Sequence, residues 1–571
     1  MMHRLFIFIV LHLFTSQIIS QSNHAFRSPV DIPMYLSGNF GEIRDDHFHS
    51  GIDIKTGGVT GYEVHSIEEG YVSRIKVQAN GYGKSIYVSH PTGHTSLYGH
   101  LDRYHSDIAD YVKKIQYERR SHAVDIYLKP GQFRLNKGDV VGYSGNTGSS
   151  SGPHLHFEIR TTEDQHPTNV LKYGFDIRDR IPPRFHRLFL YPLGDSSHVM
   201  GSPGKFSTAV LQRDGQYLLP SVPEVKAGGT IGVGAEVFDY LDGAPNRCGV
   251  YTLSLYVNGD PVYSHVLDEF SFSETRFINA HIDYGERSTS GAKVHRLYRL
   301  PNDRLRIYRD LVSDGMIRIR PDGDYHIRMV ASDVAGNSSE LQFRIRGEPA
   351  LPFDKNSLDE SVQRMPYHRI NRFSSDGVQL EIPAYALYED LDFSFSAEPA
   401  PDGMHSGLYR IHSPETPVHL PFRLSVMTES PDPAHPDRYC LVRIDQDGEK
   451  SYAGGTFSEG AVTAEVRSFG TYGVVMDTIP PEIVPLDWRV AGDFRGASSI
   501  RFRIIDDLSG IDQYEGFIDN DWALFEYDPK NELLTCVLDP ARVDQGSLHE
   551  LELYVTDACG NVNLYHTTFR W

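Results

Sequence analysis

The sequence predicts a mainly β protein built from several domains. At 571 residues the chain is too long for one hydrophobic core, so we expect roughly three to five domains. The 33 Tyr and 29 Phe residues are plentiful. Short runs rich in Tyr, Val, Ile and Thr recur between Gly, Pro and Asp turns, which is typical of strands. We therefore expect an antiparallel β-sheet domain with a short inserted helix, followed by β-sandwich domains.

The first twenty residues have the pattern of an export signal. His3-Arg4 precedes an apolar run from Leu5 to Phe14, which is too short to span a membrane as a helix. We expect cleavage near Ser20 and a mature protein in the periplasm or cell envelope; a retained membrane anchor is the alternative. No later segment is apolar enough to span a bilayer. The net charge of −21 disfavours nucleic acid as a partner.

A His-x-His pair on a predicted strand is the first sign of a metal site. From His154 to Ile159, polar and apolar residues alternate. Because successive strand side chains point to opposite faces, the imidazoles of His154 and His156 emerge on one side of the sheet. Neutral imidazole is a favoured zinc ligand, but such a pair alone is a weak signal. Glu158 shares this face, which leaves open a contact with a zinc-bound histidine.

A second candidate pair of ligands, His49 and Asp53, lies earlier in the chain and could join His156. On a straight strand, four residues would separate them by roughly 13 Å, too far to share an ion whose bonds are about 2 Å long. Ser-Gly between them and the alternation that follows disfavour a helix. We therefore expect the chain to bend at Ser50-Gly51. His47 is a rival ligand, but only His49 has the x-Gly-x-Asp continuation.

A third segment, Ser96–Leu101, is another short strand pattern and contains His100. Together with His49-x-x-x-Asp53 and the segment 152–158, it resembles the lysostaphin/LytM-type zinc metallopeptidases, which cut peptide bonds in peptidoglycan. Other segments that fit this family are Gly70-Tyr71-Val72, Gly81-Tyr82-Gly83, residues 137–142 and residues 144–148. The resemblance covers roughly residues 30–160. It implies zinc on His49, Asp53 and His156, with His100 and His154 as the catalytic histidines.

The implied ligand set has the character of a catalytic zinc site, because three protein ligands leave a fourth position open. Zinc in such a site polarises a scissile carbonyl and lowers the pKa of a bound water toward about 7. The sequence has no His-Glu-x-x-His to supply a glutamate base. One histidine must then accept the proton of water, while another steadies the oxyanion or protonates the leaving amine. His100 and His154 are available, and their order stays open.

An insertion between His100 and Lys137 departs from the compact family pattern. Residues 106–115 have the periodicity of an amphipathic helix, with Ser106 as the N-cap and acidic residues in the first turn. We expect either a flap beside the substrate groove or a brace packed on the outside of the sheet.

Paired motifs indicate a repeated module after the predicted peptidase domain. Asp179–Pro183 recurs as Asp477–Pro481, and Asp333–Asn337 recurs as Asp557–Asn561 after strand-like runs. The pattern resembles bacterial immunoglobulin-like domains. For the Asp-x-x-Gly-Asn segments we expect Asx-type turns rather than calcium sites, since calcium needs six to eight oxygen ligands. The predicted division is a signal peptide (1–20), a peptidase domain (21–178), a β-sandwich with an insertion (179–347), a β-rich domain of uncertain type (355–476) and a second β-sandwich (477–571).

The four cysteines are too few for a disulfide framework in a chain of this length. Cys536 and Cys559 lie at or beside strand-like runs in the last domain and are a candidate pair. We expect Cys248 and Cys440 to be free.

Three functions fit these observations. The leading one is an exported zinc metalloendopeptidase that hydrolyses stem or cross-link peptides of peptidoglycan, and we expect residues 21–178 to carry it alone. The second is a catalytically weak relative that binds the wall or activates another hydrolase, although such proteins typically lose ligands. The third is an adhesion or scaffold protein with an accessory peptidase domain, whose β-sandwich modules bind an envelope protein.

Overall fold

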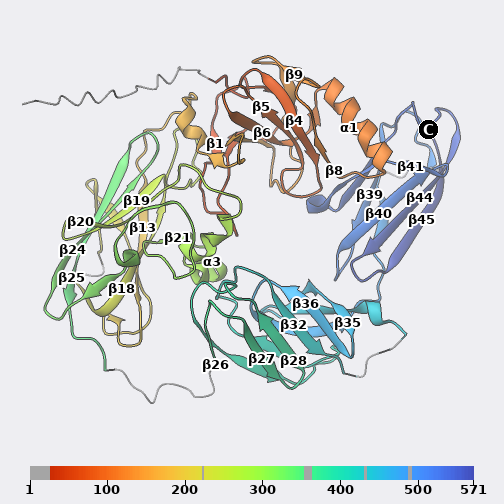
Figure 1. The fold of residues 1–571 in the computed structure, drawn as a ribbon. Helices are drawn as coiled ribbons and strands as arrows, with labels where there is room; N and C mark the ends of the chain where they lie inside the picture. The colour runs from red at the N-terminus through yellow and green to blue at the C-terminus, as the bar shows by residue number, and fades with distance from the viewer. Residues whose placement is uncertain (1–25, 221–223, 353–362, 430–431, 433, 487–491) are drawn as a thin grey trace, which may run out of the picture.

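The computed structural model describes residues 26–571, apart from 221–223, 353–362, 430–431, 433 and 487–491. The predicted export signal, residues 1–20, lies outside these described residues. Four β-rich units follow one another around a ring, and the last returns to the first (Figure 1). The prediction of a mainly β protein with antiparallel sheets is confirmed. No helix among the described residues is long and apolar enough to cross a membrane.

The first unit contains a nine-stranded sheet whose main path runs β1-β2-β11-β6-β5-β4-β8. All of its pairings are antiparallel. A smaller sheet pairs β3, β10 and β7. The strands are β1 (Leu36–Gly38), β2 (Ile52–Lys55), β3 (Glu63–His65), β4 (Gly70–Val77), β5 (Lys84–Ser89), β6 (His94–Leu101), β7 (Arg103–Tyr104), β8 (Val124–Tyr127), β9 (Arg134–Leu135), β10 (Val140–Tyr143), β11 (His154–Thr161) and β12 (Pro167–Thr168).

The alternating sequence of β11 explains its position in the middle of this sheet. Leu155, Phe157 and Ile159 are fully buried in the core beneath the sheet. Burying side chains of this size stabilises the fold by about 1.5–3 kcal/mol each. The polar residues of β11 take the other face, so the strands predicted at His154–Ile159 and Ser96–Leu101 are confirmed.

The inserted helix α1 (Ser106–Arg119) is a brace and not a flap. Ile108 and Val112 are buried in the core of the first unit, as the predicted apolar stripe requires. The opposite side of α1 meets the fourth unit through an ion pair between Lys113 and Asp539. The predicted N-cap was wrong by one residue: His105 occupies that position and makes no side-chain cap hydrogen bond.

The second unit is one large assembly of strands with a helical insertion. Its main path runs β15-β13-β18-β25-β24-β19-β20-β22, antiparallel except where β25 meets β17 and β18. The elements are β13 (Arg184–Pro192), β14 (His198–Val199), β15 (Phe206–Ala209), β16 (Leu211–Arg213), β17 (Gln216–Leu218), β18 (Val225–Phe238), β19 (Thr252–Val257), β20 (Asp260–Val266), α2 (Ile278–His281), α3 (Tyr284–Ser290), β21 (Val294–Arg296), β22 (Tyr308–Leu311), β23 (Ile317–Ile319), β24 (Asp324–Ser332) and β25 (Ser338–Gly347).

The third unit holds two five-stranded sheets and the pair β26-β29 around a single apolar core. One sheet runs β27-β28-β32-β36-β35 and the other β30-β31-β37-β33-β34. The strands are β26 (Gln363–Met365), β27 (Asn371–Ser375), β28 (Val378–Ile382), β29 (Leu391–Phe393), β30 (Phe395–Glu398), β31 (Leu408–Ile411), β32 (Phe422–Met427), β33 (Tyr439–Ile444), β34 (Lys450–Gly454), β35 (Thr456–Ser458), β36 (Ala461–Val466) and β37 (Gly470–Met476).

The fourth unit packs two four-stranded sheets, β38-β39-β43-β42 and β41-β40-β44-β45, around one core. The strands are β38 (Glu482–Leu486), β39 (Ser499–Ile505), β40 (Ile511–Ile518), β41 (Asp521–Ala523), β42 (Phe525–Asp528), β43 (Leu533–Val537), β44 (Leu548–Asp557) and β45 (Val562–Arg570). The predicted domain limits, at residues 21–178, 179–347, 355–476 and 477–571, remain a proposal for how the chain divides.

The segment at Asp557 forms an Asx turn, as predicted, because the backbone N–H of Cys559 donates to the Asp557 carboxylate at 2.9 Å. In both repeated segments the aspartate also accepts from the backbone N–H four residues on. The amide of Asn337 donates to the carboxylate of Asp333 at 2.9 Å, and Asn561 donates to Asp557 in the same way at 2.8 Å. In the second and fourth units this aspartate lies beside two others, one from the Asp-x-Ile-Pro-Pro motif and one from a further segment. The two trios are Asp179, Asp239 and Asp333, and Asp477, Asp506 and Asp557.

Cys536 and Cys559, the candidate pair, do not form a disulfide. Both thiols are free and buried. Cys536 lies in the core of the fourth unit, whereas Cys559 packs with Cys440 of the third unit in a separate cluster. The β43 strand and the turn after β44 therefore place the two sulfurs in different apolar environments. Cys248 and Cys440 are also free, as predicted.

An apolar core between units anchors the segment that precedes the site. Phe40 and Phe48 of the first unit pack on Phe270 of the second, with ring centroids 5.0 and 5.7 Å apart. Tyr388 of the third unit joins the same core. The chain around His49 is therefore held by the second and third units as well as by its own sheet.

Candidate active site

Three adjacent strands of the central sheet and one loop bring all five predicted site residues together. Asp53 lies on β2, His154 and His156 on β11, and His100 on β6. The register of the ladder places His156 directly opposite Asp53. His49 lies in the loop before β2.

The bend predicted at Ser50-Gly51 is present, at Gly51. A side chain at this position would have its Cβ only 2.3 Å from the carbonyl oxygen of Phe157. Glycine is therefore required here for the chain to pass close to β11. The bend returns the ring of His49 to within 3.1 Å of the Asp53 carboxylate (Nε2 to Oδ1).

Three side-chain atoms converge on one point with the spacing of metal ligands. His49 Nε2, His156 Nδ1 and Asp53 Oδ1 are separated by 3.0–3.1 Å in every pairing. Tetrahedral ligands at about 2.0–2.1 Å from zinc would lie about 3.3 Å apart. All three residues are buried. This donor set of two imidazoles and one carboxylate therefore fits zinc without rearrangement.

Hydrogen bonds on the far side of both rings fix which nitrogen faces this point. His49 Nδ1 donates to the carbonyl of Asn39 at 2.8 Å. His156 Nε2 donates to the carboxylate of Glu158 at 2.8 Å. Because both acceptors lack a proton, the inner nitrogens carry the lone pairs when the rings of His49 and His156 are neutral, as they are when they bind a cation.

The other two histidines are held in the same way. His100 Nδ1 donates to the carbonyl of Thr147 at 2.8 Å, and His154 Nδ1 donates to the carbonyl of Gly152 at 2.8 Å. The two rings face each other with centroids 4.8 Å apart. His154 Nε2 lies 3.4 Å from Asp53 Oδ1. Both rings thus present Nε2 beside the ligand cluster.

His100 has an unusual backbone conformation for a residue in a strand. Its φ is +57°, in the left-handed region that side chains other than glycine seldom adopt. Such strain persists only where surrounding contacts impose it, and it is common at active sites. Burial, reinforced by the neighbouring His156 and His154, lowers the pKa of His100 to about 3. His100 is therefore neutral at physiological pH.

The sequence left open a contact between Glu158 and a zinc-bound histidine, and the structure has it. Glu158 is fully buried and also accepts from Ser50 at 2.7 Å and from Arg160 at 2.6 Å. Burial would raise the pKa of this carboxyl, but the charge of Arg160 and the hydrogen bond from His156 outweigh it and lower the pKa. Glu158 is thus an ionised acceptor.

Three supporting residues were not assigned a role from the sequence. Arg44 donates to Asp53 Oδ2 at 2.8 Å. Tyr82 packs against His156 with ring centroids 5.1 Å apart, and Asn39 supplies the carbonyl for His49. Tyr82 lies in the Gly81-Tyr82-Gly83 motif, which was its only signal. The rival ligand His47 is half exposed and pairs with Asp46 instead.

The five residues line a groove of about 1190 Å³. Six basic side chains contribute to its walls, together with the acidic Asp45 and Asp46. The basic residues are Arg44, Lys55, Arg74, Lys76, Arg287 and Lys293. Arg287 and Lys293 come from the second unit, so the groove is built by two units. Helix α1 does not line it.

Comparisons with known proteins confirm the resemblance drawn from the motifs. Residues 47–117 and 117–169 match the model of Peptidase family M23, so the first unit carries an M23-type peptidase domain. Residues 362–477 match the Zu5-like domain, which corresponds to the third unit.

The curated relatives match a short part of the chain. The chain is 29% identical over 112 residues to the DD-carboxypeptidase/endopeptidase Mpg of Neisseria meningitidis, covering 20% of each chain. It is 35% identical over 66 residues to the peptidoglycan DD-endopeptidase ShyA of Vibrio cholerae, covering 12% of this chain and 15% of that protein. The match thus spans about a fifth or less of the length of these relatives.

Two solved structures of peptidases are each similar to about a quarter of the chain. The catalytic domain of lysostaphin from Staphylococcus simulans is 22% identical, with a TM-score of 0.18, covering 24% of this chain and 91% of that one. A zinc-containing peptidase from Vibrio cholerae is 25% identical, with a TM-score of 0.19, covering 25% of this chain and 39% of that one.

Proposed function

We propose that the chain is an exported zinc metalloendopeptidase that hydrolyses stem or cross-link peptides of bacterial peptidoglycan. The observation that carries this proposal is the convergence of His49, Asp53 and His156 on one point, with His100 and His154 beside them in the same groove. His49, Asp53 and His156 would hold the zinc ion. When bound, Zn²⁺ polarises a scissile carbonyl and lowers the pKa of a bound water.

The remaining histidines supply the proton transfers in this proposal. His100 and His154 both turn Nε2 toward the groove, with Nδ1 fixed as a donor to a backbone carbonyl. One accepts the proton of the attacking water and the other stabilises the oxyanion or protonates the leaving amine. Arg44 holds the second oxygen of Asp53, which leaves Oδ1 directed at the ligand cluster.

The groove supports peptidoglycan as the substrate. Its basic side chains would attract the free carboxylates of stem peptides, and the similar protein ShyA is named a peptidoglycan DD-endopeptidase. Export is supported by the residue pattern of the first twenty residues and by the location of this substrate outside the cytoplasm.

Digestion of isolated peptidoglycan by the purified chain, followed by mass analysis of the fragments, tests the proposal. We expect fragments that differ by hydrolysis of one peptide bond, and none with His154→Ala. Binding to the wall without any cleavage would instead favour the alternative of a wall-binding or hydrolase-activating protein.

A further inference from the structure

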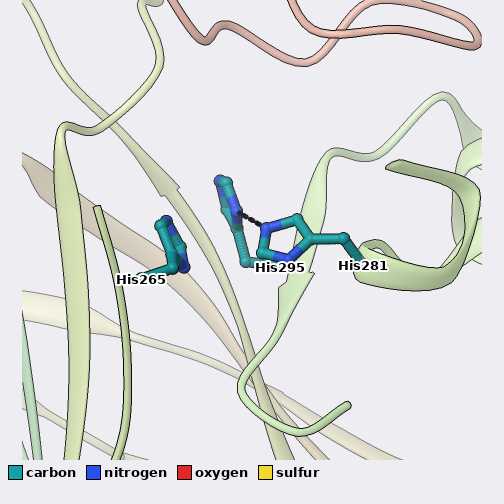
Figure 2. A group of neighbouring side chains, drawn as sticks. All are labelled: His265, His281 and His295. Atoms are coloured by element: carbon teal, nitrogen blue, oxygen red, sulfur yellow. Dashed lines mark hydrogen bonds between the residues drawn. The ribbon is translucent and has the colours of Figure 1, made fainter. Parts of the chain in front are cut away.

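A second group of converging histidines lies in the second unit, away from the peptidase groove. His265 is on β20, His281 on α2 and His295 on β21 (Figure 2). The three side chains are almost completely buried, with at most 2% of each residue exposed. Their candidate ligand nitrogens all lie within 4.8 Å of one another. We propose that His265, His281 and His295 bind one divalent transition-metal ion of the zinc class.

The spacing of the rings matches that of imidazoles around a shared ion. The centroids are 4.9, 5.2 and 5.5 Å apart, and those of His49 and His156 in the peptidase site are 5.0 Å apart. His281 Nε2 and His295 Nδ1 approach to 3.0 Å, the contact marked in Figure 2. These distances suit nitrogen ligands, and imidazole is a preferred donor for Zn²⁺, Co²⁺ and Cu²⁺.

Outer hydrogen bonds set the tautomers as they do in the peptidase site. Tyr308 donates its only hydroxyl proton to Asp303. Its oxygen, 3.3 Å from His281 Nδ1, can then only accept from that nitrogen, so His281 Nε2 keeps its lone pair. Such outer partners are the usual support of metal-bound histidine.

His265 supplies the strongest sign of a metal site. Its Nδ1 lies 3.1 Å from the hydroxyl of Tyr263. Its Nε2 is buried and has no hydrogen-bond partner in the part of the chain that the structure describes. An unpaired polar atom in a protein interior is costly, whereas coordination to an ion would satisfy it. Ordinary core packing explains the burial of the trio but not this nitrogen.

The position of the trio indicates a structural role. His281 packs edge-on against Phe48, with ring centroids 5.8 Å apart, and Phe48 directly precedes His49. An ion that ties β20, α2 and β21 together would hold the insertion of the second unit behind the loop that carries His49.

Metal content of the full chain tests this site independently of peptidase activity. In the variant His49→Ala/His156→Ala, which lacks two ligands of the groove, we expect one equivalent of Zn²⁺ or Co²⁺ per chain. Adding His265→Ala should remove it, whereas the exposed His326→Ala should not. His281→Gln keeps most of the side-chain volume and should also abolish binding of this metal ion.

A groove variant that has native circular dichroism but binds no metal would overturn the proposal. If the His265 and His281 variants fail to fold, the Co²⁺ absorption spectrum of the groove variant extended by His100→Ala and His154→Ala still decides. That chain keeps none of the four histidines of the peptidase site, so a spectrum typical of nitrogen ligands supports the second site and its absence overturns it.

A separate observation concerns the backbone carbonyls that hold His49 and His100. Asn39, whose carbonyl accepts from His49, is clamped through its side chain to the second unit: Nδ2 donates to Gly249 O at 2.7 Å and Oδ1 accepts from Gly249 N at 2.8 Å. Lys530 of the fourth unit donates to the carbonyls of Asn146 at 2.6 Å and Gly148 at 3.1 Å. These two residues flank Thr147, which holds His100.

We infer that Asn39 and Lys530 are positioning residues through which the neighbouring units orient the histidines of the groove. This inference rests on the proposed function. Asn39 orients His49, a proposed zinc ligand, and Lys530 orients His100, which is proposed to transfer protons. A change at Asn39 should therefore alter zinc affinity, whereas a change at Lys530 should alter kcat.

We expect Lys530→Ala to lower kcat on peptidoglycan roughly 10–100-fold through misplacement of His100, with zinc content and KM unchanged and partial recovery in Lys530→Arg. Asn39→Ala should weaken zinc binding. Lys113→Ala, which breaks another contact between the first and fourth units away from this loop, is the matched control.

Equal losses in Lys113→Ala and Lys530→Ala would show a general docking effect and overturn the role of Lys530. Unchanged zinc affinity in Asn39→Ala would overturn the role of Asn39. An inactive wild-type chain would contradict the proposed function instead, and the zinc affinity of Asn39→Ala could still be measured.

Discussion

Asp53 and His156 face each other across the β2–β11 ladder, with Oδ1 and Nδ1 3.0 Å apart. This pairing fixes two of the three proposed ligands by the register of a central sheet. A one-residue slip would turn one of them to the opposite face. The third ligand, His49, depends on the bend at Gly51 and on contacts with other units.

Removal of the metal should abolish hydrolysis. With a chelator present, we expect no cleavage of peptidoglycan, and one equivalent of Zn²⁺ bound in the groove should restore it. Without the ion, His100 and His154 can still transfer protons, but in this account nothing else in the site polarises the scissile carbonyl or lowers the pKa of the attacking water. Time courses of muropeptide release before and after zinc addition measure this. Full activity in chain shown to be metal-free would rule out the ligand assignment.

Glu158→Gln should weaken zinc binding about 10–100-fold, the usual scale for losing the partner of a metal-bound histidine. The amide keeps the shape of the side chain but no longer offers an ionised acceptor to His156 and Arg160. Competition with a chromogenic chelator gives the affinity. The exposed Glu163→Gln is the control, and an identical affinity in both variants would contradict the role of Glu158.

The buried Asp239 should make stability depend on pH. Burial, with the charges of Asp179 and Asp333, raises its pKa to about 8, against about 3.9 in unfolded chains. Between these values the folded state holds a proton that the unfolded state has lost, so stability falls as pH rises from about 4 to about 8. Denaturant unfolding across this range should show a smaller fall in Asp239→Asn. Parallel curves for the two proteins would refute the assignment.

The local parts of the site followed from the sequence, because each depends on neighbours in the chain. Alternation from His154 to Ile159 predicted β11, and the distance argument predicted the bend before Asp53. The cap of α1 and the pairing of Cys536 could not be predicted reliably, since a single residue or a long-range contact decides them.

Contacts between units had no signal in the sequence. Asn39 and Gly249 are 210 residues apart, and neither stands in a recognisable pair. His265, His281 and His295 lack the regular spacing of a metal motif and meet only through the fold. The expectation that residues 21–178 act alone took no account of these contacts, and the clamps at Asn39 and Lys530 lead us to expect reduced activity from that fragment.

Bound zinc and turnover, measured side by side for His154→Ala and His156→Ala, test the proposed peptidase site most directly. Both residues lie on β11, but only His156 is assigned as a ligand. His156→Ala should lose the zinc of the groove together with activity. His154→Ala should keep that zinc and lose activity roughly 10²–10⁴-fold, the scale of a missing general acid or base. A His154→Ala chain without groove zinc, beside a His156→Ala chain that retains it, would contradict the assignment.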